Sequence, residues 1–352
     1  MNKKTVAILF GGNSTEYEVS LQSAYSVIEA IDRTQYHVLL IGITRDGQWF
    51  LYEGETSHIL DDTWSKSNAC TSVMLSPEPK DHGILLRNSP DAQVIRLDAV
   101  FPVLHGKNGE DGTVQGLLQM AGIPRVGCGL LSSAICMDKD IAHRLVRAEG
   151  VAVPKSTVLF AYPTEEEFSV IDSNFHYPVF VKPANAGSSY GITQVFHKEE
   201  LPGAVQNAFL HDHKVIVEET IDGFEIGCAI MGDVDLIVGE LDEIELKQGF
   251  FDYTEKYSLI TSKIHMPARI DAKIKNEILI TARLIYRTLG CKGFARVDMF
   301  LTPYREIVFN EVNTIPGFTS HSRYPNMFKG IGWSFSQIIA TLLEQTFQES
   351  ES

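Results

Sequence analysis

The chain has 352 residues, 44% of them hydrophobic, with a mean hydropathy of −0.02 and a formal net charge of −15. These values predict a soluble globular protein of two or three domains, without a nucleic-acid partner because no basic face is evident, and without a membrane-spanning stretch. The cysteines are odd in number and never in a Cys-x-x-Cys spacing, which argues against disulfides and zinc and indicates a reducing cytoplasm: Cys70, Cys128, Cys136, Cys228 and Cys291.

The N-terminal stretch has the pattern of an α/β domain. Residues 5–10 are predicted to form a buried strand, a helix begins at about Ser20 after a glycine turn, and residues 36–43 form a second strand. This order indicates a doubly wound sheet. Glu16 and Glu18 stand at its ligand-binding edge, although they can instead simply complement the helix macrodipole. No Gly-x-Gly-x-x-Gly follows the strand, so a dinucleotide is not favoured.

A glycine-rich loop follows the next predicted strand. Residues 52–96 are polar and irregular, and the sequence predicts no element there. Residues 98–104 are predicted to be a strand that ends in His105-Gly-Lys-Asn-Gly-Glu110-Asp-Gly. Such a loop can bring His105 and Glu110 into a cleft, or it can be a tight turn in solvent.

A second domain is predicted to begin near Gly127, and Met137-Asp-Lys139 opens a helix. Residues 183–191 form a loop of small residues between predicted strands at 177–182 and 192–196. The N–H groups of such a loop can fold over phosphates, although it lacks the ending of a P-loop. A plain hairpin loop remains the alternative.

The residues after 214 are predicted to form a third region. Residues 215–219 are predicted to form a strand that ends in acids, and Glu225 starts another. Residues 243–263 are aromatic and charged without clear periodicity, which is more typical of a functional lid than of filler. Helices are predicted over residues 272–289 and 333–343.

A hairpin near the C-terminus holds the most informative polar residues. Residues 294–301 and 306–312 are predicted to be antiparallel strands joined by a proline turn. The expected register places Asp298 opposite Phe309. Side chains alternate with a period of two, so four of them share one face: Arg296, Asp298, Glu311 and Asn313.

Two carboxylates, an amide oxygen and a guanidinium on one face form a hard-oxygen site beside a permanent cation. Mg²⁺ favours such a site and fills its remaining positions with phosphate and water. The alternative is a surface hairpin with an ordinary cross-strand ion pair.

Together these stretches resemble the D-alanine–D-alanine ligase family of the ATP-grasp fold, over essentially the whole chain. The order and spacing of the motifs carry the resemblance, because each motif alone is modest. They are Gly11-Gly-Asn-Ser-Thr-Glu16-Tyr-Glu-Val-Ser20, His105-Gly-Lys-Asn-Gly-Glu110-Asp-Gly, Met137-Asp-Lys139, Lys182-Pro followed by Gly187-Ser188-Ser189, Lys256-Tyr257, and Asn310-Glu311-Val-Asn313-Thr-Ile-Pro-Gly317-Phe-Thr-Ser-His-Ser322.

The resemblance implies an α/β (α+β) ATP-grasp fold with an N-terminal doubly wound, Rossmann-like domain. Residues 1–126 would bind substrate and form a homodimer, residues 127–214 would carry the phosphate loop, and residues 215–352 would carry the lid loop and the metal-binding hairpin. A cytoplasmic enzyme is expected.

The resemblance also implies how ATP and two Mg²⁺ ions, for which Mn²⁺ can substitute, would be bound. The metal ligands would be Asp298, Glu311 and Asn313. The residues that would contact ATP are Lys139, Lys182, Ser188, Ser189, Glu218, Glu219, Ile221, Glu225, Lys256, Phe309 and Asn310. In this set the lysines would meet phosphates, Glu218 and Glu219 the adenine, and Glu225 the ribose.

In the implied reaction the first D-alanine attacks the γ-phosphate of ATP and becomes an acyl phosphate. Glu16 would pair with its ammonium, and His105 would lie close by. Tyr257 would bond to Ser188, which also meets Glu16, so closure of the lid and binding of the substrate would be linked.

The amine of the second substrate would then attack the acyl phosphate. Arg296 and the N–H of Gly317 would stabilise the tetrahedral oxyanion. Ser322 would bind the carboxylate of the second substrate.

Two positions depart from the usual D-Ala–D-Ala pattern. Phe251 stands where tyrosine is common, and Arg323 stands where an aliphatic residue is common. Both departures are similar to the vancomycin-resistance ligases, and the retained Lys256-Tyr257 is unlike the D-lactate-forming members. The closest likeness is to the D-alanine–D-serine ligases. A serine hydroxyl needs a polar partner in the second subsite, and Asp242 or Arg323 of this chain can supply it. A housekeeping D-Ala–D-Ala ligase is the alternative.

Overall fold

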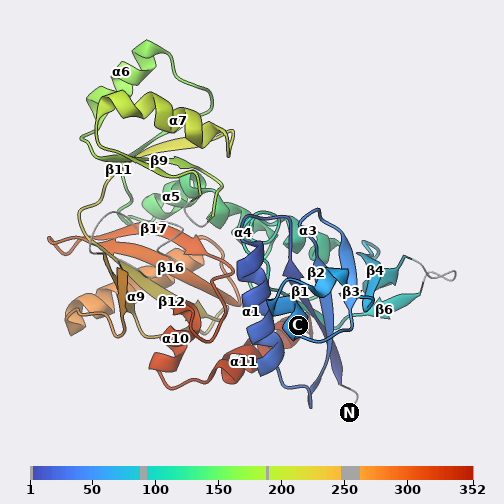
Figure 1. Ribbon diagram of the computed structural model, residues 1–352. Coiled ribbons are helices and arrows are strands. Elements are labelled where there is room, and N and C mark those ends of the chain that lie inside the picture. Colours follow the sequence, from blue (N-terminus) through green and yellow to red (C-terminus); the bar gives the residue numbers. More distant parts are fainter. Residues whose placement is uncertain (1–2, 88–92, 188–189, 247–261, 352) are drawn as a thin grey trace.

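The computed structural model describes residues 3–87, 93–187, 190–246 and 262–351, whose strands gather into three sheets (Figure 1). The first sheet comes from the N-terminal part of the chain, the central sheet from the middle and the third sheet from the C-terminal part. In Figure 1 the central sheet stands above the third sheet, and the first sheet lies beside them. No helix within these ranges is long and apolar enough to cross a membrane.

The first sheet has a parallel centre and an antiparallel extension. β1 pairs in parallel with β2 and with β7, whereas the successive pairs from β2 to β6 are antiparallel. The predicted strand-turn-helix-strand order is confirmed, with helix α1 (Tyr17–Ala30) beginning before Ser20. In spatial order the strands are β6 (Val94–Arg96), β5 (Gly83–Leu86), β4 (Cys70–Leu75), β3 (Trp49–Tyr52), β2 (Tyr36–Ile43), β1 (Lys4–Gly11) and β7 (Ala99–Pro102).

The stretch in which the sequence predicts no element, residues 52–96, supplies β4, β5 and β6. It also contains the short helix α2 (Ser57–Leu60) and a 3₁₀ turn, Trp64–Lys66. These strands are short and only partly buried, so they lack the regular apolar alternation that reveals a strand in a sequence.

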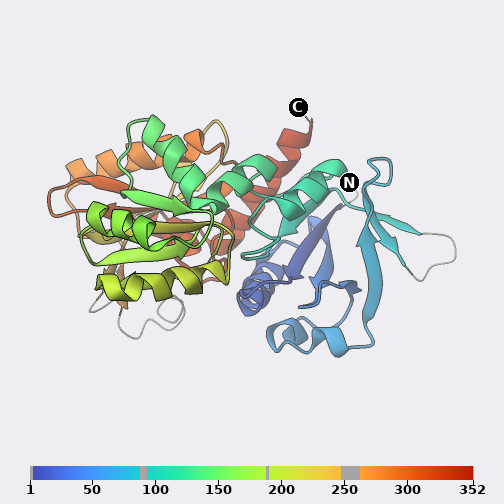
Figure 2. The same ribbon diagram turned by 90° about the horizontal axis from the view of Figure 1, so that it is seen from above.

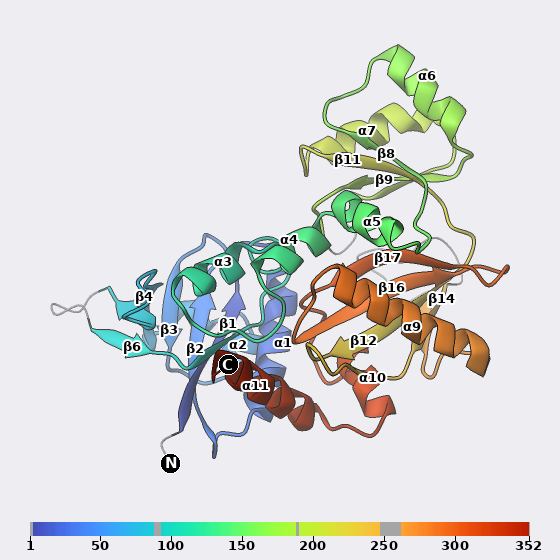
Figure 3. The ribbon, with the colours of Figure 1, turned by 180° about the vertical axis from the view of Figure 1, so that it is seen from behind.

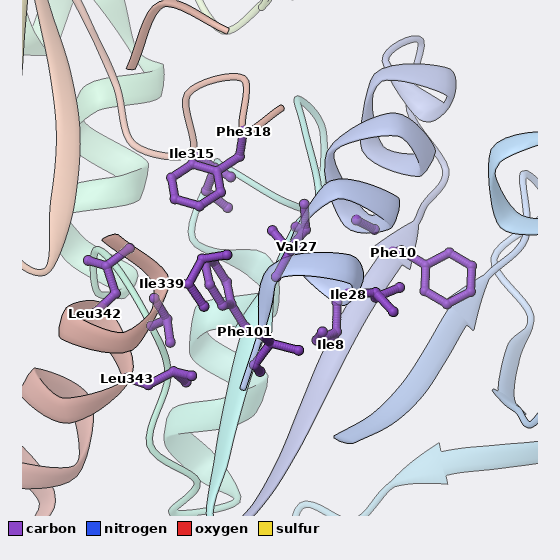
Figure 4. Close-up of a cluster of buried hydrophobic side chains, with 14 of the residues drawn as sticks. Ile8, Phe10, Val27, Ile28, Phe101, Ile315, Phe318, Ile339, Leu342 and Leu343 are labelled. Carbon is purple, nitrogen blue, oxygen red and sulfur yellow. The ribbon is translucent and has the colours of Figure 1, made fainter. Parts of the chain in front are cut away.

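Helices from both ends of the chain cover the first sheet. β1 is almost continuously apolar because a parallel strand is covered on both faces. Val27 of α1 and Leu342 of α11 (Phe335–Glu351) belong to one core cluster with β1 and β7 (Figure 4). On the other face α3 (Thr113–Met120) contributes Leu118 to a second cluster. Figure 2 shows α11, in red, reaching from the third sheet toward the N-terminal strands.

The central sheet is antiparallel, with α6 (Glu165–Asn174) and α7 (Leu201–Phe209) beside it (Figure 1). The two strands predicted on either side of the small-residue loop are confirmed as β9 and β10, which pair antiparallel. In spatial order the strands are β10 (Thr193–Val195), β9 (Val179–Pro183), β11 (Val215–Glu219) and β8 (Ser156–Leu159). A 3₁₀ turn, Lys198–Glu200, precedes α7.

The third sheet is also antiparallel, and α9 (Ala272–Thr288) packs across one of its faces (Figure 3). The predicted helix over residues 272–289 is thereby confirmed. In spatial order its strands are β15 (Ser262–His265), β14 (Asp242–Leu246), β12 (Phe224–Met231), β16 (Phe294–Leu301) and β17 (Ile307–Asn313), and β13 (Ile237–Val238) pairs with β12.

Three shorter helices complete the fold around the third sheet. α4 (Leu130–Met137) and α5 (Lys139–Ala148) lead from the first sheet to the central one, and α10 (Arg323–Gly330) packs near β12. Asp138 caps α5 by accepting a hydrogen bond from the N–H of Ile141, which confirms the predicted helix start.

Two predicted boundaries need correction. The closing helix, predicted over residues 333–343, is α11 and continues to Glu351. The predicted lid, residues 243–263, begins and ends in β14 and β15, and residues 247–261 lie outside the described part of the chain.

The predicted register of the β16–β17 hairpin is wrong. Asp298 pairs with Glu311 rather than Phe309, and Arg296 pairs with Asn313. The turn is one residue longer than predicted, since Thr302 donates to the carbonyl of Glu306, and a register shift follows Asp298. The longer turn and the register shift each displace the pairing by one residue. Together they displace it by an even number of residues, so all four polar side chains still share one face.

Substitution of Trp64 tests the packing against the first sheet. Its ring is fully buried and packs edge-on against the rings of Phe10 and Tyr52, with centroid distances of 4.9 and 6.0 Å. Its N–H donates to the hydroxyl of Tyr17 over 3.1 Å. We expect Trp64→Ala to lower the free energy of unfolding by roughly 3–5 kcal/mol, measured by urea denaturation. Tyr304→Ala is the control, because Tyr304 is 93% exposed and its loss should cost less than about 0.5 kcal/mol. A loss below about 1 kcal/mol for Trp64→Ala would contradict this packing.

Candidate active site

The third sheet aligns polar residues in rows across its strands. Asp242 of β14, Gly227 of β12, Asp298 of β16 and Glu311 of β17 stand side by side, because each is paired with the next. The neighbouring row continues with Arg296 and Asn313. The prediction that these charged and amide side chains share a face is therefore confirmed, and the row extends to Asp242.

Asp298 is the charged centre of these rows and is only 1% exposed. Arg296 Nε lies 2.8 Å from Asp298 Oδ1 and Arg296 Nη2 lies 2.7 Å from Oδ2. Asn313 Nδ2 donates to the same Oδ2 over 2.8 Å. Burial alone would lower the pKa of the Arg296 guanidinium, but the charge of Asp298 raises it, so Arg296 is a permanent cation.

Arg323, the first residue of α10, is held by carboxylates of two strands. Its Nε and Nη2 lie 2.8 and 2.7 Å from the two oxygens of Asp242, and its Nη1 lies 2.7 Å from Glu225 Oε1. Nη2 also lies 3.7 Å from Asp298 Oδ1. Gly227 makes this possible, because a Cβ there would overlap the guanidinium and lie 2.6 Å from Asp242 Oδ1. Glu225, expected at the ribose, is thus paired with Arg323.

A cavity of about 320 Å³ opens beside these residues. It brings together most of the residues expected to bind and activate the amino acids, from both ends of the chain. Asp242 lies behind Arg323 and is not part of the wall, so of the two expected partners for a serine hydroxyl only Arg323 borders the cavity. The expected residues in the wall are Glu16, His105, Arg296, Asn313, Gly317, Ser322 and Arg323.

Glu16 immediately precedes α1 and is 6% exposed. Two glycines leave room for its carboxylate. A Cβ on Gly106 would overlap Glu16 Oε2, and a Cβ on Gly187 would lie 2.7 Å from it. The N-terminal turn, the His105 loop and the small-residue loop of the central sheet therefore meet at this carboxylate.

The His105 loop is buried against the third region rather than forming a turn in solvent. His105 is 3% exposed, and its Nδ1 lies 2.9 Å from the carbonyl oxygen of Ile315. A carbonyl only accepts, so Nδ1 carries the proton and Nε2 accepts from the hydroxyl of Ser23 over 3.0 Å. Burial lowers the pKa of His105, and the ring is neutral.

Glu110 closes the same loop. Its Oε2 accepts from the N–H of Gly106 over 2.8 Å and its Oε1 accepts from the N–H of Ile315 over 3.1 Å. Burial, together with the negative charge of Glu16, raises the pKa of Glu110. Sequence reasoning placed Glu110 near a cleft without giving it a partner.

The residues expected at the phosphates come from facing elements. Lys139, at the start of α5, donates to the carbonyl of Ala186 over 2.9 Å and lies 3.4 Å from Glu311 Oε2. Lys182 of β9 forms a buried ion pair with Glu218 of β11. Two lysines thus lie beside two carboxylates where the small-residue loop, the central sheet and the hairpin meet.

His143 is a residue of this region that sequence reasoning missed. Its Nε2 donates to the carbonyl of Asn310 over 2.8 Å, and its ring lies 5.4 Å from that of Phe309. Its Nδ1 is then an acceptor that faces Glu218 Oε2 at 3.9 Å, and both atoms are buried without a hydrogen-bond partner among the described residues. Two buried acceptors that face each other would be satisfied by a hydrogen-bond donor placed between them. The spacing of four residues from Lys139 on one helix face was the available signal.

Two further residues expected to contact ATP, Glu219 and Ile221, lie at the end of β11 and just after it. Glu219 Oε1 accepts from the N–H of Lys155 over 2.7 Å, and Ile221 lies in the half-buried connection between β11 and β12. The residues that lie outside the described part of the chain are Ser188, Ser189, Phe251, Lys256 and Tyr257.

The donor set on the hairpin fits a divalent metal that arrives with phosphate. Asp298, Glu311 and Asn313 offer only oxygen ligands, which hard cations prefer. Across the described ranges no group of three or more His, Cys, Asp or Glu is arranged to hold an ion. A divalent metal held by Asp298, Glu311 and Asn313 would complete its coordination with phosphate oxygens and water.

Comparisons with known proteins cover nearly the whole chain. The family model described as D-ala D-ala ligase N-terminus matches residues 5–128, and that described as D-ala D-ala ligase C-terminus matches residues 145–344. The solved structure of the VanG D-Ala:D-Ser ligase from Enterococcus faecalis has 56% sequence identity and a TM-score of 0.91, over 98% of this chain and 100% of that chain.

Curated relatives agree with this result. A D-alanine–D-alanine ligase of Caldicellulosiruptor bescii is 43% identical over 99% of this chain and 97% of its own length. A putative D-alanine–D-lactate ligase of Streptomyces coelicolor is 44% identical over 96% of this chain and 96% of its own length. The chain therefore belongs to the D-alanine–D-alanine ligase family and is an ATP-dependent ligase with the ATP-grasp fold.

Proposed function

We propose that this ligase joins D-alanine to D-serine, with ADP and phosphate as the other products, and that the dipeptide enters peptidoglycan precursors. The observation that carries the proposal is the guanidinium of Arg323, which Asp242 and Glu225 hold at the wall of the cavity. The 56% identity to the VanG D-Ala:D-Ser ligase supports it. Synthesis of D-Ala-D-Ala is the alternative, because a relative that is 43% identical carries that name.

The preference for serine follows from the donors of Arg323. A guanidinium has five N–H groups, and Asp242 and Glu225 engage its three nitrogens with one hydrogen bond each. The N–H groups left over can donate to a hydroxyl in the cavity. The methyl group of D-alanine offers no acceptor, so its binding would leave a desolvated donor unpaired, which costs about 1–3 kcal/mol.

The first chemical step would be phosphorylation of D-alanine. Glu16 would hold the ammonium, so that the carboxylate of the substrate faces the γ-phosphate of ATP. Lys139 and Lys182 would reduce the repulsion between these two anions. A divalent metal bound with ATP would be held by Asp298, Glu311 and Asn313 and would neutralise further phosphate charge.

The second step would be attack of the D-serine amine on the acyl phosphate. Arg296 and the N–H of Gly317, which both line the cavity, would receive the developing oxyanion. Ser322 precedes α10 and its hydroxyl lies 2.8 Å from that of Thr319, beside Gly317. The carboxylate of D-serine would bind there, where the positive end of the helix dipole favours an anion.

Product analysis tests the substrate directly. The protein would be incubated with ATP and Mg²⁺ and with D-alanine, D-serine or both, phosphate release would be measured, and products would be identified by mass. We expect the mixture to stimulate phosphate release most strongly and to yield mainly D-Ala-D-Ser. Equal or faster turnover with D-alanine alone would favour the alternative, and no release in any reaction would reject both.

Arg296→Ala tests the oxyanion site. Loss of one such donor typically lowers the rate about 10²–10³-fold, so dipeptide formation should almost disappear while the affinity for ATP stays nearly unchanged. Arg269→Ala, which removes a half-exposed arginine paired with Glu243, is the matched control. A variant that keeps more than about a tenth of wild-type turnover would contradict the role of Arg296.

Arg323→Met tests the choice of the second substrate. In an equimolar mixture of D-alanine and D-serine, the ratio of D-Ala-D-Ser to D-Ala-D-Ala should fall by roughly tenfold, the effect of about 1.4 kcal/mol. The ratio is independent of how much of the enzyme is folded, which matters because the change leaves Asp242 without its cation. Lys329→Met, at an exposed position of the same helix, is the control. An unchanged ratio would remove Arg323 from the explanation.

A further inference from the structure

We propose that Ser23, His105 and Glu110 are positioning residues that hold residues 315–318 in place and thereby aim the N–H of Gly317 at the oxyanion. This inference deepens the proposed function and rests on it, because it concerns the ligation step. None of the three residues needs to touch the reacting atoms. Their hydrogen bonds to the segment are the evidence.

Both polar groups of the Ile315 backbone are bound by side chains of the His105 loop. The carbonyl accepts from His105 Nδ1 over 2.9 Å, and the N–H donates to Glu110 Oε1 over 3.1 Å. These contacts join positions 210 and 205 residues apart in the chain. The other Glu110 oxygen accepts from the N–H of Gly106, so the loop that makes the contacts is itself held closed.

Ser23 of α1 holds the other end of the segment. Its hydroxyl oxygen accepts from the N–H of Phe318 over 3.3 Å, while the hydroxyl donates to His105 Nε2 over 3.0 Å. The bonds run in one direction from the N–H of Phe318 through Ser23 and His105 to the carbonyl of Ile315. Each group has the donor or acceptor that it needs, and only the tautomer with a proton on Nδ1 completes the series. We call this series the loop brace.

Gly317 lies between the two bound ends. Ile315 and Phe318 are 4% and 1% exposed, and the ring of Phe318 lies 5.7 Å from that of Phe101 and 5.4 Å from that of Phe294. Figure 4 shows Ile315 and Phe318 above the cluster that α1, β7 and α11 share. Packing therefore fixes the apolar side of the segment, and the loop brace fixes its polar side.

The loop brace also changes the role expected for His105. Both of its ring nitrogens are engaged within the protein, although the residue borders the cavity. His105 thus acts on the reaction through the Ile315–Gly317 backbone rather than by binding D-alanine. An oxyanion donor must lie within a few tenths of an ångström of its place, because misplacement by about 1 Å can cost 10²-fold.

The test separates the two chemical steps in single-turnover experiments by rapid quench, with ADP and dipeptide measured in the same samples. Glu110→Gln keeps the shape of the side chain but replaces one of the two acceptor oxygens by an NH2 group, which cannot accept from an N–H. Ser23→Ala breaks the loop brace from a different element. We expect ADP to form at close to the wild-type rate in both variants, whereas dipeptide formation slows about tenfold or more.

Asp111→Asn is the matched control. Asp111 is the next acid in the same loop, and it accepts from the N–H groups of Asn108 and Thr113 without reaching the 315–318 segment. It should leave both steps unchanged. An equal slowing of ADP and dipeptide, unchanged dipeptide formation in either loop-brace variant, or a similar effect of Asp111→Asn would overturn the inference. If the unmodified protein forms ADP but no dipeptide, the proposed function fails instead.

Discussion

One buried carboxylate, that of Asp298, organises the chemistry of this site. Taking a carboxylate out of water costs several kcal/mol unless cations and hydrogen-bond donors replace the water. Arg296 and Asn313 bind it directly, and Arg323 lies 3.7 Å away. The proposed oxyanion donor, the proposed metal-binding face and the wall of the second subsite therefore meet at one buried carboxylate.

The similarity to relatives extends over nearly the whole chain, yet their names differ in the second substrate. The fold and the ATP-dependent chemistry thus leave the second substrate open. We propose that Arg323 governs this choice in the present protein, and that side chain can be buried because Gly227 leaves space for it. Specificity then follows from which hydrogen-bonding groups border the cavity after the ion pairs have formed.

Local patterns were sufficient for much of the fold. The buried strand β2, the strand β11 and the amphipathic helix α9 were predictable because their apolar residues follow the period of a strand or helix. The shared polar face of the β16–β17 hairpin was predicted although the register was not, because the register is displaced by an even number of residues and Glu311 and Asn313 therefore stay on the face of Arg296 and Asp298. The motifs, taken in order, further indicated the family, the use of ATP and a metal, and most residues that line the cavity.

Only the tertiary structure decided which groups those residues meet. The pairing of Asp298 with Glu311 depends on a register shift that no local pattern reveals. The bond between His105 and Ile315 joins residues 210 positions apart, and a side chain's partner at such a distance depends on how the sheets pack. The sequence by itself thus determined the elements and the chemical groups available, because both follow from local periodicity and residue type. The three-dimensional packing determined the partner, burial and protonation of each group, because these depend on neighbours that are distant in the chain.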